Sequence, residues 1–301
     1  MSASSRVFVT GATGVIGRRV VPLLVAAGHD VTAVGRTPEK RAALAALGAT
    51  PAEADLFDVA SLRRALDGHD AAVNLATHMP RSTNRMLLPF AWRENDHVRR
   101  EGSAALAEAA HAAGVRRLVQ ESFAPIYEDG GATWIDESWP VRPVKYNRTT
   151  LDAERSAARF TERGGAGVVL RFAMFYGADS PFLHEMAKVA RRGWLPLPGA
   201  PAAFVSTVSH DDAASAVVAA LDVPAGIYNV VDDEPLTRAA WGAAFAASLG
   251  VRPPRPLPSW LSHLSSLFEL LGRSQRMSNA KLRATGWAPR DRSFREGFRE
   301  V

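Results

Sequence analysis

The sequence predicts an α/β protein built on a doubly wound parallel sheet, with a smaller and discontinuous C-terminal lobe. Short runs rich in β-branched residues alternate with longer amphipathic runs, which is the pattern of parallel strands joined by helices. A glycine-rich turn follows the first of these strands, and proline-rich pieces interrupt the chain beyond residue 177. A chain of 301 residues with 47% apolar content can bury one large core or two smaller ones.

The alternation of strands and helices is clearest in the first part of the chain. Gly28 and Gly114 follow amphipathic runs and are expected C-caps, whereas Pro38 opens another helix at its first turn. The helices are expected at residues 15–27, 38–47, 92–113 and 146–163. The strands are expected at residues 7–10, 31–35, 71–75, 117–120 and 168–172.

Two parts of unequal size follow from these elements. Residues 1–176 are expected to form the sheet domain, and residues from about 204 to 232 complete the sheet with a further strand at 227–231. Residues 177–203 and 233–301 are expected to form the small lobe, because prolines there separate short elements.

The composition excludes several classes of function. The chain has no cysteine, which excludes disulfides, thiolate metal sites and cysteine nucleophiles and is consistent with a cytoplasmic protein. Its first residues run directly into a strand and no stretch of about 18 apolar residues occurs, so we expect neither a signal peptide nor a membrane span. The net charge is +5, but the arginines are spread along helices. This favours an anionic substrate or an arginine-rich proteome over a nucleic-acid partner.

Acidic pairs in the second half of the chain predict caps and turns. Asp211 and Asp212 are expected to cap a helix at 213–221, and no third ligand follows at a useful spacing. The Asp-Asp-Glu segment at 232–234 is expected to be an exposed turn. We therefore predict no bound metal.

The turn after the first strand has the composition of a dinucleotide-binding site. Gly11 permits a tight turn, Gly14 lets backbone N–H groups approach a pyrophosphate, and Gly17 lets the helix pack closely on the strand. The N-terminus of the helix adds partial positive charge near the phosphates. The turn therefore predicts a Rossmann-type fold that binds a pyridine dinucleotide. The turn residues expected to contact the cofactor are Gly11, Thr13, Gly14, Val15, Ile16 and Gly17.

The end of the second predicted strand indicates which dinucleotide is bound. An acidic residue usually accepts the ribose 2′-hydroxyl of NAD at this point, but the chain has Arg36 after a glycine. A guanidinium group matches the geometry and charge of a 2′-phosphate. The sequence therefore predicts NADP(H) in preference to NAD(H).

With these residues in view, the chain resembles the extended short-chain dehydrogenase/reductase superfamily, also described as NAD-dependent epimerases and dehydratases. The likeness covers nearly the whole chain and includes the segments at 171–177 (RFAMFYG) and 210–213 (HDDA), Asn95 and the pairs Tyr228-Asn229 and Gly286-Trp287. It implies a homodimer formed through the long helices. Further cofactor contacts that the resemblance implies are Asp55, Leu56, Leu75, Ala76, Thr77, Tyr146 and Phe172.

The chain departs from the superfamily at the catalytic positions. The superfamily has a Ser or Thr where this chain has Phe123, with Ser122 one residue earlier, and a lysine where this chain has Thr150. The tyrosine of the motif is kept as Tyr146. A free tyrosine has a pKa near 10, so only about 0.1% is phenolate at neutral pH unless a cation stabilises it. We expect Tyr146 to donate a proton in its neutral form, assisted by Ser122 or by His78, which follows the strand at 71–75.

The substrate pocket is expected to be apolar. Nucleotide-sugar enzymes of the superfamily have an asparagine where this chain has Met174, which removes a polar contact for the sugar nucleotide. The side chains expected to line the pocket are Phe123, Met174, Phe175, Phe182, His184 and Trp194.

These residues predict an NADP(H)-dependent, atypical member of the superfamily that reduces a carbonyl or activated double bond of a small, apolar metabolite. Two alternatives stay open. The first is a redox-neutral isomerase, lyase or cyclase that uses His78 and Tyr146 for proton transfer. The second is a non-catalytic NADP sensor that resembles the NmrA-like regulators, for which a degraded catalytic motif is also expected.

Overall fold

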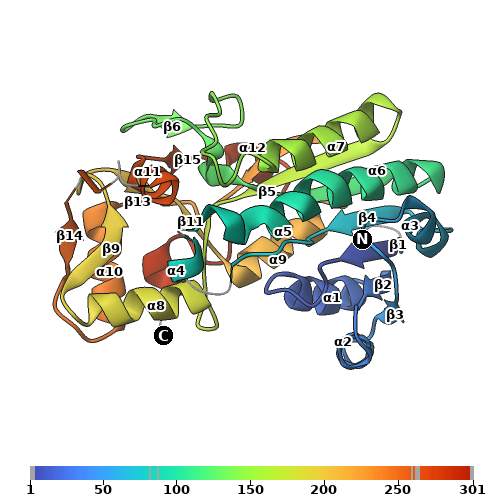
Figure 1. Ribbon diagram of the computed structural model, residues 1–301, viewed down its shortest axis with the longest axis horizontal. Coiled ribbons are helices and arrows are strands. Elements are labelled where there is room, and N and C mark those ends of the chain that lie inside the picture. The colour runs from blue at the N-terminus through green and yellow to red at the C-terminus, as the bar shows by residue number, and fades with distance from the viewer. Residues whose placement is uncertain (1–3, 81–82, 87, 259, 262–264, 299–301) are drawn as a thin grey trace.

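A central sheet with its helices occupies one end of the elongated molecule, and a lobe of short elements occupies the other (Figure 1). The computed structural model describes residues 4–80, 83–86, 88–258, 260–261 and 265–298. Among the described residues, no helix combines the length and the apolar character that crossing a lipid bilayer requires.

Seven parallel strands form the central sheet, in the order β12-β7-β5-β4-β1-β2-β3. The chain starts at β1 in the middle, moves outward through β2 and β3, and then crosses to β4 on the other side of β1. Ligands of such sheets bind where the strand order reverses, at the carboxyl ends of the strands. The predicted doubly wound α/β fold is confirmed. The strands of this sheet are β1 (Arg6–Thr10), β2 (Asp30–Val34), β3 (Thr50–Ala52), β4 (Ala71–Asn74), β5 (Arg117–Phe123), β7 (Ala166–Phe172) and β12 (Gly226–Val230).

Helices cover both faces of the sheet, so each strand buries alternate side chains in opposite cores. Val7 and Val9 of β1 face one core and Phe8 faces the other. On the first face lie α1 (Gly17–Ala26), α2 (Pro38–Ala46) and α9 (His210–Ala219). On the second face lie α3 (Val59–Ala65), α6 (Ser103–Ala112) and α7 (Thr150–Glu162).

The long helix expected at 92–113 is helical but is not a single α-helix. A 3-10 turn, η1 (Pro89–Trp92), is followed by α5 (Arg93–His97), and the chain then widens into one π-helical turn, η2 (Val98–Gly102), before α6. Turns of this kind often occur at functional sites. Here the π turn contains Arg99, whose side chain is buried.

The helix expected at 146–163 begins later than predicted. Tyr146 lies in a turn that precedes α7, and this turn is closed by hydrogen bonds from Asn147 N to the Val144 carbonyl and from Thr150 N to the Asn147 carbonyl. Tyr146 and Thr150 are therefore not one helical turn apart on a regular helix.

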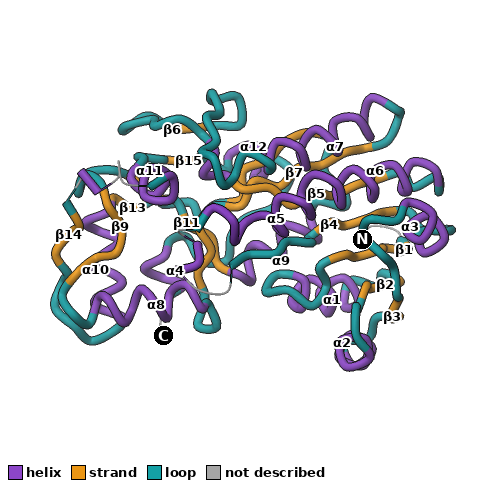
Figure 2. The backbone as a smooth tube through the Cα atoms, viewed as in Figure 1, coloured by secondary structure: helices purple, strands orange, loops and turns teal. Residues whose placement is uncertain are grey.

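The small lobe has a core of its own, formed by Trp241, Phe245 and Phe294 with aliphatic side chains of α8. Its elements are short and are joined by long loops (Figure 2). The larger ones are α8 (Pro181–Ala190), β9 (Trp194–Pro198), α10 (Arg238–Ser248), β14 (Arg255–Leu257), α11 (Ser266–Gly272) and α13 (Phe294–Gly297). The remaining short elements are α4 (Thr83–Met86), η3 (Ala124–Ile126), β6 (Trp134–Ile135), β8 (Met174–Tyr176), β10 (Phe204–Val205), β11 (Thr207–Ser209), β13 (Leu236–Thr237), β15 (Arg276–Met277) and α12 (Ala280–Arg283).

The acidic pairs behave differently from the prediction. Ser209, not Asp211 or Asp212, caps α9, because its hydroxyl accepts the Asp212 N–H at 2.9 Å. The Asp212 carboxylate instead accepts hydrogen bonds from the backbone N–H groups of Arg290 and Asp291. Asp232 is only 2% exposed, so the segment at 232–234 is not an exposed turn throughout. Among the described residues, no group of three His, Asp or Glu side chains is arranged to hold a metal ion.

Candidate active site

The glycine turn between β1 and α1 is packed against the end of β4. Gly11 has a φ of +69°, and a Cβ on it would lie 2.3 Å from the Leu75 backbone carbonyl. A Cβ on Gly17 would lie 2.3 Å from the Gly11 oxygen, so both positions require glycine for internal packing. A Cβ on Gly14 would meet only the Gly11 oxygen, at 3.1 Å. The protein's own packing therefore leaves space beside Gly14, as the close approach of a ligand to the backbone needs.

The N-terminus of α1 is available for an anion. Ile16 is its N-cap residue and makes no side-chain cap, and the first turn contains no acidic residue. The partial positive charge of this helix end is therefore not neutralised by a side chain of α1. Together with the space beside Gly14, this geometry fits the pyrophosphate of a dinucleotide.

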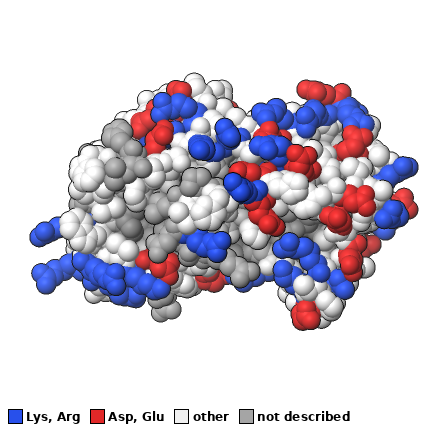
Figure 3. Space-filling view, in the orientation of Figure 1, with Lys and Arg blue, Asp and Glu red and all other residues white. Residues whose placement is uncertain are grey.

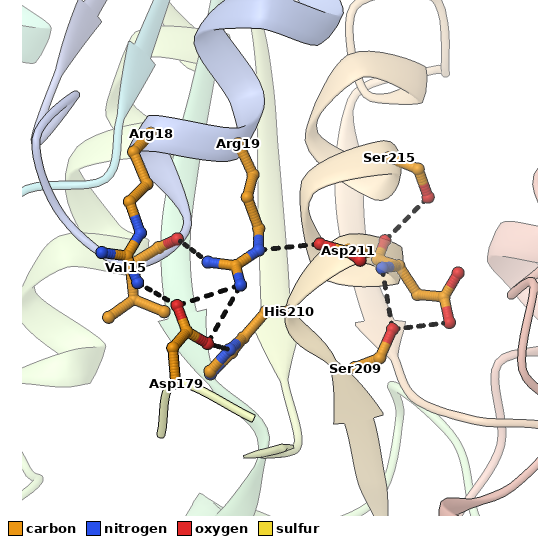
Figure 4. A network of polar contacts seen from close by, with 9 residues as sticks. Val15, Arg18, Arg19, Asp179, Ser209, His210, Asp211 and Ser215 are labelled. Carbon is orange, nitrogen blue, oxygen red and sulfur yellow. Dashed lines mark hydrogen bonds and ion pairs between the residues drawn. The ribbon is translucent and has the colours of Figure 1, made fainter. Parts of the chain in front are cut away.

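Two arginines, an aspartate and a histidine form a polar network between the start of α1, the loop after β8 and the start of α9 (Figure 4). Asp179 accepts hydrogen bonds from Arg18 and Arg19 of α1, and its carboxylate lies 2.9 Å from Nδ1 of His210. Partial burial raises the pKa of Asp179, but the hydrogen bonds from Arg19 and His210 outweigh it and bring the pKa to about 2. Burial lowers the pKa of His210. A carboxylate fixed by two arginines thus holds the start of α1 against the RFAMFYG segment.

The predicted contacts for the adenosine half follow the carboxyl ends of β2, β3 and β4. Arg36 is exposed at the end of β2, and its neighbour Arg41 donates to the Gly35 carbonyl and pairs with Glu53. Asp55 is exposed and caps its own turn by accepting the Phe57 N–H, whereas Leu56 packs against the π turn, close to Gly102. Ala76 and Thr77 continue from Leu75 past the glycine turn and become progressively more exposed.

Tyr146 lies half-buried beside the ring of Trp92, with 4.5 Å between the ring centroids. Burial raises the pKa of Tyr146 above its usual value, and the positive charges of Arg99 and Arg273 oppose this shift without cancelling it. Tyr146 is therefore protonated at neutral pH and can give a proton but is a poor base.

Two polar side chains that the sequence analysis did not identify lie next to Tyr146. Arg99 is 4% exposed; it donates to the Thr150 hydroxyl at 2.8 Å and to Glu121 at 3.1 Å. Asn147 is fully buried, and neither of its amide atoms has a partner among the described residues. In the structure Arg99 lies on the inner face of this helical segment, together with the buried residues at 95, 98, 102, 103 and 106.

Ser122 and His78 have different surroundings. Ser122 is fully buried, and its hydroxyl donates to Glu154 of α7, which is also bound by Arg171. His78 is partly exposed at the carboxyl end of β4; its backbone N–H donates to Asn95, and its ring lies 3.9 Å from Glu94. His78 is therefore accessible to a substrate, whereas the Ser122 hydroxyl is occupied.

The structure brings most of the expected apolar residues to the ends of β5 and β7. Phe123 of β5 is in register with Phe172 of β7. The ring centroid of Phe172 lies 5.4 Å from that of Phe175, and Met174 immediately precedes Phe175 in the sequence. All three candidate side chains, Phe123, Met174 and Phe175, are partly buried. On the small lobe, Phe182 packs against the lobe core, while His184 and Trp194 are exposed, the latter by 44%.

Charges of both signs are interspersed on the face shown in Figure 3, over the part that contains the sheet. No stripe of a single sign marks that part of the face.

The fold and the site define an NAD(P)-binding protein of the Rossmann class. The family described as NAD(P)H-binding matches residues 11–180. Over 309 aligned residues the chain is 36% identical to a 3-diazoavenalumate denitrifying reductase of Streptomyces, covering 97% of this chain and 99% of the relative. It is 27% identical to a 2-alkyl-3-oxoalkanoate reductase of Shewanella oneidensis, covering 90% of this chain and 74% of the relative.

A solved structure shares the whole fold. The human epimerase family protein SDR39U1, crystallised with NADPH, superposes with a TM-score of 0.78 at 25% identity and covers 98% of each chain. The protein belongs to the NAD(P)H-binding family of extended short-chain dehydrogenases/reductases. Both of these sequence relatives are reductases, which supports an oxidoreductase with a nicotinamide cofactor.

Proposed function

We propose that the protein is an NADPH-dependent reductase that acts on a carbonyl group or activated double bond of a small, largely apolar metabolite. The observation that carries this proposal is the neutral Tyr146, half-buried beside the guanidinium group of Arg99, in a family that binds nicotinamide cofactors.

The preference for NADPH rests on Arg36. Its guanidinium group stands at the end of β2, where the adenosine ribose is bound in this fold, and it makes no ion pair with another described residue. It is therefore available for the 2′-phosphate. The human structural relative contains NADPH, which is consistent with this choice.

The chemistry needs one hydride and one proton. Bound NADPH supplies a hydride to the electrophilic carbon of the substrate. Tyr146 donates its phenolic proton to the oxygen on which negative charge develops, and solvent then restores that proton. An alkoxide is a stronger base than a phenolate, so the raised pKa of Tyr146 does not prevent this transfer. His78 is the accessible candidate to assist.

The substrate class follows from the side chains at the ends of β5 and β7. Phe123, Met174 and Phe175 present apolar surface there, and Met174 stands where sugar-nucleotide enzymes of the superfamily have an asparagine. We therefore expect a small ketone or enone and not a sugar nucleotide.

The test is NADPH consumption at 340 nm with a panel of ketones and enones, run in parallel with the Tyr146→Phe variant. Reduction by the natural protein that the variant loses supports the proposal. Product formation without a change at the nicotinamide absorbance would point to the redox-neutral alternative. Tight NADPH binding without turnover of any compound would point to a sensor.

An aryl diazonium compound is the second candidate substrate, favoured by the 36% identity to a 3-diazoavenalumate denitrifying reductase over 97% of this chain. Hydride addition to a diazonium carbon forms a C–H bond, breaks the C–N bond and releases N2, and it needs no proton. A site without the superfamily's Ser and Lys is sufficient for that step. Here Tyr146→Phe should retain N2 release, whereas ketone reduction should be lost.

A further inference from the structure

We infer that Arg99 supplies the positive charge that the superfamily's motif places on a lysine at position 150, and that it holds the nicotinamide ribose of the bound cofactor beside Tyr146. This inference rests on the proposed function, because it assigns a positioning residue for that same cofactor.

The first support is the position of the guanidinium group. Nη1 of Arg99 donates to the Thr150 hydroxyl at 2.8 Å, so the cation sits directly on the residue that replaces the lysine. Both side chains are buried, Arg99 to 4% exposure and Thr150 completely. A lysine at position 150 would extend from the helix into the space that Arg99 reaches from η2.

The second support is the electrostatic coupling to Tyr146. The charge of Arg99 acts on the phenol of Tyr146 and favours its ionised form, which is the effect expected of the motif's lysine. A guanidinium group also remains charged throughout the pH range in which proteins are folded. The exchange of lysine for arginine therefore keeps a permanent cation at the site.

The third support is the unused hydrogen-bonding capacity of Arg99. Nη2 of Arg99 donates to Glu121 at 3.1 Å, and Nη1 donates to the Thr150 hydroxyl. Nε has no hydrogen-bond partner among the described residues. A buried N–H without a partner is uncommon in folded proteins. The hydroxyl groups of a ribose are suitable acceptors, so a cofactor would complete the set of hydrogen bonds.

The alternative role is a structural ion pair between Arg99 and Glu121 that ties η2 to β5. The two roles predict different results when Glu121 is changed. If the pair is only structural, loss of either partner weakens the site equally. If Arg99 is the cation for the cofactor, removal of the Glu121 carboxylate leaves the positive charge of Arg99 less neutralised, so Arg99 attracts the cofactor more strongly.

The experiment is a fluorescence titration of NADPH with the natural protein and four variants whose folding is checked by thermal unfolding. Arg99→Ala should raise the Kd for NADPH by about tenfold or more, as expected for loss of a charge-assisted contact. Arg99→Ala combined with Thr150→Lys should recover most of this loss, because the lysine returns a cation to the same place. Glu121→Gln should bind NADPH more tightly. Arg100→Ala, which alters the exposed neighbour paired with Asp152, should leave the Kd unchanged.

The outcomes separate this inference from the proposed function. If the natural protein binds neither NADPH nor NADH, both are wrong. If it binds NADPH and a folded Arg99→Ala variant binds equally well, only the role of Arg99 is wrong. If Arg99→Ala does not fold, the double variant decides: restored folding with weak NADPH binding contradicts the inference. Equal weakening by Arg99→Ala and Glu121→Gln would identify a structural ion pair.

Discussion

The guanidinium group of Arg171 binds both carboxylate oxygens of Glu154, at 2.8 Å and 2.7 Å, and both side chains are buried. This pair fastens β7 to α7, the helix that follows the turn containing Tyr146. Because Ser122 donates to the same carboxylate, the hydroxyl nearest to the superfamily's catalytic Ser or Thr position is part of this structural unit.

Loss of Glu154 should therefore destabilise the protein strongly. Glu154→Ala leaves the Arg171 charge buried without a partner, and we expect the free energy of unfolding to fall by about 3–5 kcal/mol. The matched control is Glu108→Ala, which removes an exposed partner of Arg163 and should cost about 0–1 kcal/mol. Urea unfolding measures both, and similar losses in the two variants would contradict the assignment.

Ser122→Ala and Tyr146→Phe should separate structure from chemistry. The first removes a buried hydrogen bond to Glu154 and should lower stability by about 1–3 kcal/mol while changing kcat by less than about threefold. The second should leave the fold intact and lower carbonyl reduction by about 10²–10⁴-fold. A large loss of kcat in a stable Ser122→Ala protein would show that the serine takes part in catalysis.

Gly17 and Gly14 of the turn should respond differently to substitution. At Gly17 an alanine Cβ would lie 2.3 Å from backbone, so Gly17→Ala should destabilise the protein by about 1–3 kcal/mol or more. At Gly14 the added Cβ meets one oxygen at 3.1 Å, so Gly14→Ala should fold with a loss below about 1 kcal/mol. The NADPH Kd of Gly14→Ala should nevertheless rise by about tenfold or more, because the methyl group obstructs the pyrophosphate. Unchanged NADPH binding would place the cofactor elsewhere.

Asp232 should make stability depend on pH. Burial raises the pKa of this carboxyl well above its usual value, and the nearby Asp212 and Asp291 add to the shift, although Thr207 donates to it at 2.8 Å. The folded state therefore binds a proton more tightly than the unfolded state, so this group's contribution to stability is lost as pH rises. Asp232→Asn keeps the acceptor for Thr207 and should raise Tm at pH 8 by more than at pH 5. A difference in Tm that does not change with pH would contradict this.

The sequence is sufficient to predict the fold class and the glycine turn, because both depend on local periodicity and backbone conformation. The sequence pattern does not predict the position of Arg99, because Arg99 lies in an arginine-rich segment and its inward direction depends on the π turn and on Thr150, which is distant in sequence. The exposure expected for Asp232 was wrong for a related reason. An acidic turn is usually solvated, but Thr207 of β11 lies over this one.

The sequence pattern places the start of α7 too early, because the spacing of the motif predicts one regular helix from Tyr146 onward. The turn from Val144 to Thr149 instead closes on itself by hydrogen bonds of the 3-10 type before the helix begins. The position of the Tyr146 side chain is thus set by that turn and by contact with Trp92. Hydrophobic periodicity in the sequence predicts neither of these features.

The most direct measurement for the account as a whole is a titration of the natural protein and of Arg36→Ala with NADPH and NADH, followed by nicotinamide fluorescence. We predict that the natural protein binds NADPH more tightly than NADH, and that Arg36→Ala weakens NADPH by about tenfold or more while NADH binding changes little. Equal weakening of both nucleotides, or no binding of either to the natural protein, would contradict the proposed NADPH-dependent reductase.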